Sequence, residues 1–458
     1  MLPHLTSDKG EAVPITPVTR DGFAAWLVGA AEHERNWLQA TGFAAEPGKV
    51  APLPGPDGRL ARILVGVVPD EPLWSIAGLP DTLPEGRYAL DAASWDAAMT
   101  TKAVLGWALG GYAFTRYKSR TRSFATLVWP ARTDRAEIER LTRGIFLARD
   151  LINTPAEDMG PAELAAAAAS LAKSAGARCS VITGDELLTA NYPTVHAVGR
   201  ASVRPPRLID LRWGDEGAPK VTLVGKGVCF DSGGLDLKPA AGMKLMKKDM
   251  GGAAIVLGLA SAIMDAGLPI RLRVLVPAVE NAVSANSFRP MDVIKTRSGK
   301  TVEIGNTDAE GRLILCDALA EADSEKPSLI VDVATLTGAA RVALGPDLPA
   351  LYCNDEALAE SLLHAGSEEA DPLWRMPLWQ PYRKLLDSKI ADLNNVADSP
   401  FAGSVIAALY LNEFVAATTP WAHLDVMAWN GSARPGRPEG GEAMSLRALY
   451  AHVRKRFG

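Results

Sequence analysis

The sequence has few cysteines and histidines, and no long uninterrupted apolar run. Its four cysteines show no Cys-x-x-Cys spacing and are too few for a disulfide framework in 458 residues, so we expect reduced thiols. The longest helical apolar stretch, Ala253–Met264, is far shorter than the roughly 20 residues that cross a bilayer. Residues 1–14 lack the apolar segment of a secretory signal. We therefore expect a cytoplasmic protein with no membrane anchor.

An excess of charge of one sign is also missing. The chain has 48 basic and 53 acidic residues, for a net charge of −5, which argues against a protein dominated by binding to nucleic acid or to anionic membranes. Nucleic acid is thus a disfavoured partner, although a local basic patch is compatible with this balance. The hydrophobic fraction of 48% excludes wholesale disorder and indicates a globular protein.

The chain divides into two regions that differ in their pattern of apolar and polar residues. The first, residues 1–132, has expected strands at Ala61–Val68 and Ser123–Val128, a helical stretch at Trp95–Arg116, and no group of residues suited to catalysis. Apolar residues at helical spacing then predict a connecting helix within residues 133–155. We expect a small N-terminal α/β domain followed by this connector.

The remainder, residues 156–458, alternates short β-rich runs with amphipathic helical segments. The alternation is typical of a mostly parallel sheet with helices on both faces. It predicts a larger α/β domain with a mixed, mostly parallel central sheet covered by helices. The expected strands include Arg207–Leu211, Val221–Val224, Ile270–Val276 and Leu329–Val333.

A glycine-rich turn follows one of these strands, in Val221-Thr-Leu-Val-Gly-Lys-Gly-Val-Cys-Phe-Asp-Ser-Gly-Gly234. Open α/β sheets usually bind ligands at such a place. The turn lacks both phosphate-binding glycine motifs, and Ser232 lacks the Gly-x-Ser-x-Gly context of a serine hydrolase. No histidine lies between His196 and His364, which excludes a histidine-rich zinc site here. A nucleotide-binding enzyme stays open as an alternative.

Four acidic residues mark the ends of neighbouring elements: Asp231 after a strand, Asp249 before a helix, and Asp308 and Glu310 before another. Each alone would fit a helix cap or a solvated turn. Buried together they would repel strongly and need cations. Structural ion pairs are one solution, and two divalent cations sharing bridging carboxylates are the other. The basic residues in these segments are Lys226, Lys238, Lys247, Lys248 and Arg312.

Three motifs carry a resemblance to a known family: Asn306-Thr-Asp-Ala-Glu-Gly-Arg-Leu313, Val224–Gly234 and Met246-Lys-Lys-Asp-Met-Gly-Gly-Ala-Ala254. The chain resembles the cytosolic leucine aminopeptidases, which are two-metal exopeptidases, over about residues 145–450. The first 130 residues show no comparable match. The resemblance implies an enzyme that hydrolyses an N-terminal residue of the Leu or Met type from peptides with a free N-terminus, and a homohexamer.

The resemblance also implies a ligand set. Lys226, Asp231, Asp249 and Glu310 would bind one metal, and Asp231, Asp308 and Glu310 the other. A ligating lysine must be neutral, so Lys226 as a plain counter-charge is the alternative. Zn²⁺ or Mn²⁺ is the expected ion, while Mg²⁺ and Co²⁺ stay open because oxygen ligands do not decide among them.

Two further residues receive catalytic roles from the resemblance. Lys238 would stabilise the negative charge that develops on the carbonyl oxygen, and Arg312 would hold a bicarbonate ion that acts as general base.

Asp236 stands where a small neutral residue is more usual in the family that the chain resembles. If the segment is extended, Asp236 shares a face with Lys238 and could orient it, whereas a solvent-facing acid is the alternative.

The resemblance places the pocket for the first side chain beside Met246 and the turn Thr335-Leu336-Thr-Gly338. Apolar walls there would favour Leu- or Met-like residues, although Met246 could equally be core filler. A DNA-binding or structural relative that keeps the fold without the activity is the competing class.

Overall fold

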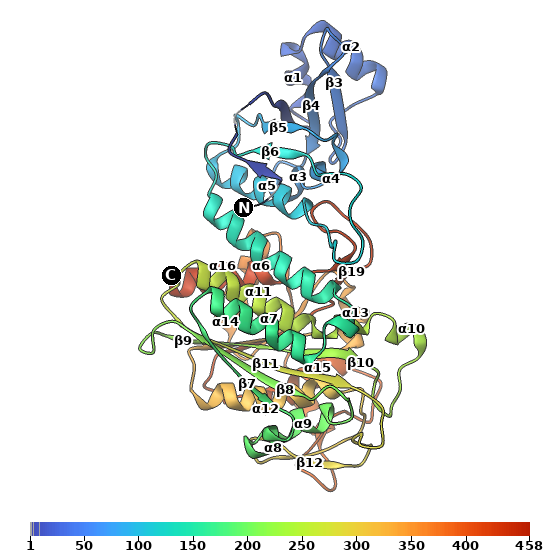
Figure 1. The fold of residues 1–458 in the computed structure, drawn as a ribbon, viewed down its shortest axis with the longest axis vertical. Coiled ribbons are helices and arrows are strands. Elements are labelled where there is room, and N and C mark those ends of the chain that lie inside the picture. Colours follow the sequence, from blue (N-terminus) through green and yellow to red (C-terminus); the bar gives the residue numbers. More distant parts are fainter. Residues whose placement is uncertain (1, 3, 9) are drawn as a thin grey trace. The chain divides into compact units, whose positions relative to one another are not determined.

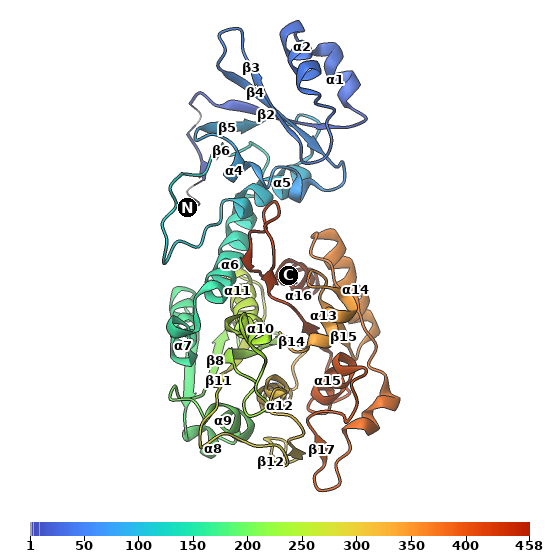
Figure 2. The ribbon, with the colours of Figure 1, turned by 90° about the vertical axis from the view of Figure 1, so that its right-hand side faces the viewer.

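The computed structural model describes residues 2, 4–8 and 10–458. By its contacts the chain forms two compact units, an N-terminal unit of residues 1–142 with 431–439, and a C-terminal unit of residues 143–430 with 440–458 (Figures 1 and 2). The helix α6 (Arg135–Asn153) runs through the boundary. No described helix is long and apolar enough to cross a membrane.

The N-terminal unit is built on a six-stranded sheet in the order β1-β6-β5-β2-β4-β3. Its neighbouring strands are parallel except for β3 and β4. The strands are β1 (Leu5–Thr6), β2 (Val13–Thr19), β3 (Val50–Pro54), β4 (Leu60–Val67), β5 (Arg87–Leu90) and β6 (Thr126–Val128). The helices are α1 (Phe23–Gly29), α2 (Glu32–Thr41), α3 (Pro72–Ser75), α4 (Leu79–Thr82) and α5 (Ala97–Gly110).

A short segment late in the sequence, residues 431–439, completes this unit. The backbones of Arg434 and Arg437 pair as an isolated bridge, and the Arg437 guanidinium lies 4.2 Å from the ring centroid of Trp74. The turn at Gly436 has a φ of +69°, in the region that favours glycine. No sequence pattern indicated this return of the chain.

The C-terminal unit contains the larger sheet, in the order β16-β15-β18-β14-β9-β11-β8-β7, with β10 beside β11. The central strands are parallel, and antiparallel pairs lie toward the two edges, so the expected mixed, mostly parallel sheet is confirmed. The strands are β7 (Arg178–Thr183), β8 (Arg207–Trp213), β9 (Lys220–Gly225), β10 (Gly227–Asp231), β11 (Arg271–Asn281), β14 (Leu329–Ala334), β15 (Ala350–Cys353), β16 (Trp374–Arg375) and β18 (Trp421–Asp425).

Helices cover both faces of this sheet (Figure 1). On one side lie α7 (Pro161–Ser174), α11 (Gly251–Asp265), α14 (Glu356–Glu368) and α16 (Leu446–Phe457). On the other lie α8 (Glu186–Thr189), α9 (Pro193–Gly199) and α12 (Glu310–Ser324). The remaining helices are α10 (Ala240–Met243), α13 (Gly338–Leu344), α15 (Gly403–Asn412) and the 3₁₀ turns Ala156–Asp158, Met246–Met250 and Gln380–Leu386. The small strands are β12 (Val293–Lys295), β13 (Thr301–Glu303), β17 (Leu393–Asn394), β19 (Trp429–Asn430) and β20 (Gly440–Gly441).

The run expected as one strand before the glycine-rich turn is broken at Lys226 into β9 and β10. The Lys226 N–H donates to Val333 O at 3.0 Å, and Lys226 O accepts from the Ala253 N–H at 2.9 Å. The start of α11 approaches the sheet closely there, because a Cβ at Gly252 would overlap Val333 O. Backbone hydrogen bonds to both β14 and α11 therefore hold the break at Lys226 in place.

Candidate metal centre

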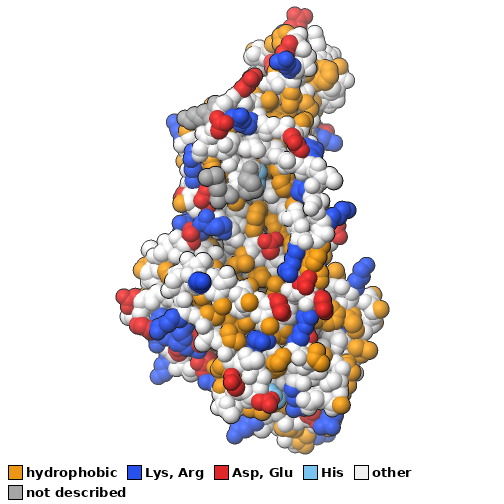
Figure 3. Space-filling model, viewed as in Figure 1, with side chains coloured by type: hydrophobic (Ala, Val, Ile, Leu, Met, Phe, Trp, Pro, Cys, Tyr) orange, Lys and Arg blue, Asp and Glu red, His pale blue; other side chains and the backbone are white. Residues whose placement is uncertain are grey.

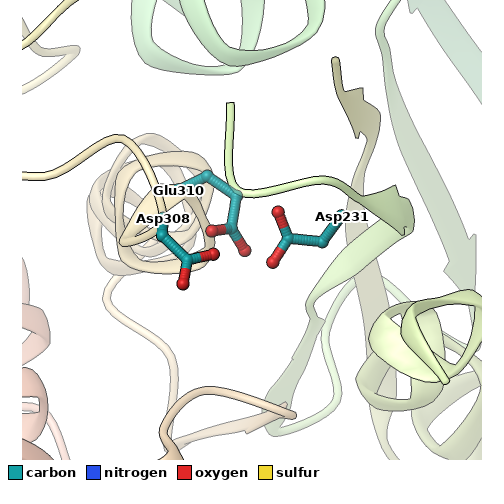
Figure 4. Close-up of side chains that lie close together, drawn as sticks. All are labelled: Asp231, Asp308 and Glu310. Carbon is teal, nitrogen blue, oxygen red and sulfur yellow. The ribbon is translucent and has the colours of Figure 1, made fainter. Parts of the chain in front are cut away.

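Three carboxylates from distant parts of the C-terminal unit point toward one another (Figure 4). Asp231 ends β10, Asp308 lies in the loop before α12, and Glu310 is the first residue of α12. One oxygen from each lies within 4.8 Å of the others. Asp231 and Glu310 are buried, whereas the Asp308 side chain is 34% exposed. The cluster thus faces a cavity through Asp308.

Lys226 joins the fourth carboxylate to this cluster. Its Nζ lies 2.7 Å from Asp249 Oδ2 and 2.9 Å from Glu310 Oε1, and donates to Thr335 O at 2.9 Å. Asp249 comes from the 3₁₀ turn Met246–Met250 directly before α11. Two of the four acids predicted from the motifs, Asp249 and Glu310, therefore pair with one buried ammonium group.

Lys238 is the second cation of the cluster. Its Nζ lies 2.8 Å from Asp231 Oδ2 and pairs with Asp308 as well. Burial would lower the pKa of Lys238, but the neighbouring carboxylates, Asp231 first, outweigh burial and raise that pKa. Lys238 is therefore held protonated.

Negative charge in the cluster exceeds what these lysines offset. Burial, with the charge of Asp231, raises the pKa of Glu310 to about 8, and the same two causes raise the pKa of Asp308 to about 6. Glu310 Oε2 is also buried without a hydrogen-bond partner. Oxygen ligands with unsatisfied charge suit hard divalent cations, so the residues present fit a metal centre.

Asn281, at the end of β11, supports Asp231 and was missed by the sequence analysis. Its Nδ2 donates to Asp231 Oδ1 at 2.9 Å and to Thr307 O at 3.1 Å. The expected strand Ile270–Val276 continues to this residue, so a polar side chain after a buried run was the available signal. Asn281 links the end of β10 to the loop that carries Asp308.

The structure corrects the expectation for Asp236. Gly233 and Gly234 have φ values of +89° and +65°, so the segment turns instead of extending. Asp236 Oδ2 accepts from the Thr307 N–H at 2.7 Å and from Thr307 Oγ1 at 3.1 Å. Lys238 pairs with other carboxylates, and among the described residues it makes no pair with Asp236. Asp236 therefore fixes the backbone next to Asp308.

One cavity of about 260 Å³ collects every residue to which the sequence analysis gave a ligand, catalytic or pocket role. Arg312 lines it, with Nη1 donating to Asn395 O at 2.7 Å and Nε buried without a partner. Lys247 does not line it, because its Nζ donates to Asn153 O at 2.6 Å. The predicted lining residues are Lys226, Asp231, Lys238, Met246, Asp249, Asp308, Glu310, Arg312, Thr335, Leu336 and Gly338, and those missed include Lys248, Asn306, Ala309, Thr337, Arg341 and Val396.

Asp425, at the end of β18, holds the turn from Thr335 to Gly338. Its carboxylate accepts from the Leu336 N–H at 3.0 Å, the Thr337 N–H at 3.1 Å and Thr337 Oγ1 at 2.6 Å. Thr335 Oγ1 in turn donates to Asp249 Oδ1 at 2.7 Å. The wall of the cavity is thereby tied to a carboxylate of the cluster.

Two known family models match the chain. The model of the cytosol aminopeptidase family, catalytic domain, matches residues 146–450. The model of the M17 aminopeptidase N-terminal domain matches residues 13–130. The second match extends the family to the N-terminal region, where the sequence motifs gave no comparable match.

Individual relatives give the same result. Probable cytosol aminopeptidases from Geobacter sp. (strain M21) and Roseiflexus castenholzii (strain DSM 13941 / HLO8) are 42% and 41% identical, covering 78% and 76% of this chain and 76% and 75% of their own. The crystal structure of the cytosol aminopeptidase from Coxiella burnetii aligns with a TM-score of 0.95 at 50% identity, covering 99% of both chains. The bottromycin maturation enzyme BotP in complex with Mn aligns at 0.88 and 35% identity, covering 97% of this chain and 99% of its own.

The raised pKa of Glu310 predicts pH-dependent metal binding. Below about pH 8 the carboxyl group is protonated in the metal-free protein, so a cation must displace that proton. In calorimetric titrations of chelator-treated protein with Mn²⁺, the Kd should increase as the pH is lowered from about 8 to about 6. The increase should be up to about tenfold per pH unit. Equal Kd values at both pH values, with no proton release, would contradict this assignment.

The contacts of Asp236 predict a supporting role. Asp236→Ser removes both carboxylate bonds to Thr307 and should lower Mn²⁺ affinity by about 10–100-fold, the usual scale for a residue that supports a metal ligand. The matched control is Asp215→Ser, an exposed turn carboxylate whose contact is local, to the Gly217 N–H. Wild-type Mn²⁺ affinity in Asp236→Ser would show that the loop holds Asp308 without it.

Proposed function

The chain belongs to the M17 cytosol aminopeptidase family and is a metal-dependent aminopeptidase, and we propose that its reaction takes place at the carboxylate cluster of the cavity. The observation that carries this proposal is the convergence of four buried or half-buried carboxylates on Lys226 and Lys238. Buried carboxylates this close together repel one another, so the cluster is stable only with added positive charge.

We propose the ligands that the resemblance implies, with Asp231 and Glu310 shared between two ions. Lys226, after losing the proton that it carries in the metal-free protein, would bind one ion together with Asp249 and the shared pair. Asp308 and the shared pair would bind the other. Zn²⁺ or Mn²⁺ is the proposed metal, and Mn in the BotP complex supports the latter. When bound, two such cations supply an acidified water and polarise the scissile carbonyl group.

The chain's own residues supply binding and charge stabilisation. The Asp249 carboxylate lies at the side of the cluster that would receive the substrate's α-amine, which accounts for a requirement for a free N-terminus. Lys238, protonated beside Asp231, would stabilise negative charge growing on the carbonyl oxygen. Arg312 has an unpartnered Nε at the cavity and would hold bicarbonate, which would supply the general base.

The substrate proposal rests on the cavity wall, and the proposals for assembly and location rest on the family. Met246 and Leu336 give the cavity apolar walls, which suits a first residue of the Leu or Met type. We propose a homohexamer because the resemblance to the family implies one. We place the protein in the cytoplasm because its relatives are named cytosol aminopeptidases.

The two alternatives gain no support from the described residues. The amides of the glycine-rich turn are taken, since the Gly233 N–H donates to Asp231 Oδ1 at 2.8 Å and the Gly234 N–H to Ser232 Oγ at 3.2 Å, which leaves them unavailable to phosphates. Acidic and basic side chains are interspersed with apolar ones on the face in Figure 3, unlike the single-sign stripe of a DNA-binding surface.

The proposed function is tested with leucine p-nitroanilide and its N-acetyl derivative. The metal-loaded protein should hydrolyse the first and not the second, because acetylation removes the α-amine that Asp249 attracts. Chelation should abolish the activity and Mn²⁺ or Zn²⁺ should restore it. Full activity in the chelated protein, or equal rates on both substrates, would refute the proposal.

Lys238→Ala tests charge stabilisation in the reaction. We expect kcat to fall by about 10²–10³-fold with the metal content retained, the usual loss for one stabiliser of a developing oxyanion. Lys173→Ala, an exposed lysine on α7, is the control and should match wild type. A rise in KM with unchanged kcat would instead make Lys238 a substrate-binding residue.

A further inference from the structure

Two cationic side chains of the cavity have no counter-ion. Lys248 is only 2% exposed and lines the cavity, yet among the described residues its ammonium group makes no ion pair or side-chain hydrogen bond. Arg341, on α13, lines the same cavity, and its Nη1 is buried without a hydrogen-bond partner. The buried ammonium group of Lys248 and the buried Nη1 of Arg341 are costly without a partner, so this pair calls for an anion.

The acids of the cavity do not supply that anion. The four carboxylates of the cluster are engaged by Lys226 and Lys238, and divalent cations would engage them further. Asp425, the nearby acid beneath the turn, is committed to the amides of Leu336 and Thr337. Positive charge at Lys248 and Arg341 is therefore left for a ligand that enters the cavity.

The position of the two cations indicates which part of a substrate they meet. Lys248 directly precedes Asp249, and the Arg341 guanidinium approaches Gly338, with Nη2 3.9 Å from where a Cβ on that glycine would lie. The proposed function, on which this step rests, puts the α-amine beside Asp249. Because the first side chain leaves the same Cα as that amine, it extends along the wall that carries Lys248.

We propose that Lys248 and Arg341 bind a carboxylate on the side chain of the substrate's first residue, so that peptides beginning with glutamate are substrates. Met246 and Leu336 contact the methylene groups of glutamate as they would contact a Leu or Met side chain. The cations then distinguish glutamate from its neutral isostere glutamine, and Arg341 offers two parallel N–H groups for a carboxylate.

The experiment compares Glu-, Gln- and Leu-p-nitroanilide on the metal-loaded protein. Wild type should show a higher kcat/KM for Glu than for Gln. Lys248→Met and Arg341→Leu should each reduce this Glu:Gln ratio by about tenfold or more, the scale of one hydrogen bond to a charged group. Lys244→Met removes an exposed lysine outside the cavity and should keep the wild-type ratio. Arg341→Gln replaces Arg341→Leu if the latter does not fold.

Two other outcomes overturn the inference. If the ratio of kcat/KM for the Glu substrate to that for the Gln substrate is one or less in wild type and does not change in either variant, the carboxylate site is refuted. The C-terminal carboxylate of a short peptide has the same chemistry, so Leu-Leu is compared with Leu-Leu-amide. If the variants change that ratio and leave Glu:Gln untouched, the cations bind the peptide's other end.

A second measurement separates this inference from the proposed function. If no p-nitroanilide is hydrolysed, the aminopeptidase proposal fails, and calorimetric binding of free L-glutamate and L-glutamine decides the carboxylate site alone. Wild type should bind glutamate about tenfold or more tightly than glutamine, with the difference lost in Lys248→Met and Arg341→Leu. Equal binding of the two amino acids overturns the site.

Discussion

The repulsion among buried carboxylates is the constraint on which the C-terminal unit depends. Asp231, Asp249 and Glu310 are removed from water within reach of one another, and burial of that charge is tolerated only with cations between them. The break between β9 and β10 brings Lys226 to that position, and bonds to β14 and α11 hold its backbone there. The central sheet thus serves as the frame for an electrostatic arrangement that would not hold together alone.

Much of the fold and of the centre could be predicted because the relevant information is local. Alternation of apolar runs and helical segments predicts the mixed sheet, and the acids lie in short motifs at element ends, where parallel strands deliver them to one edge. Glu310 begins α12 and Asp231 ends β10, as the motifs indicated. A sequence pattern can therefore predict residues whose role depends on their position at the end of a strand or helix.

Contacts that depend on distant pairing could not be predicted. Asp236 was interpreted from an assumed extended backbone, whereas two left-handed glycines redirect it to Thr307, 71 residues away. Asn281 and Asp425 hold the loops of the centre from other strands, and their positions at strand ends do not tell which loop each one contacts. Turn conformation and strand order, which sequence patterns leave open, decide these partners.

The return of residues 431–439 to the N-terminal unit bears on the order in which the protein is made and folds. On the ribosome, residues 1–142 emerge first and would ordinarily fold first as a unit. The partner of Trp74, Arg437, is synthesised only after almost the whole C-terminal unit. The first-made part of the protein is consequently the last to reach its finished packing, and until then the ring of Trp74 lacks its stacked guanidinium.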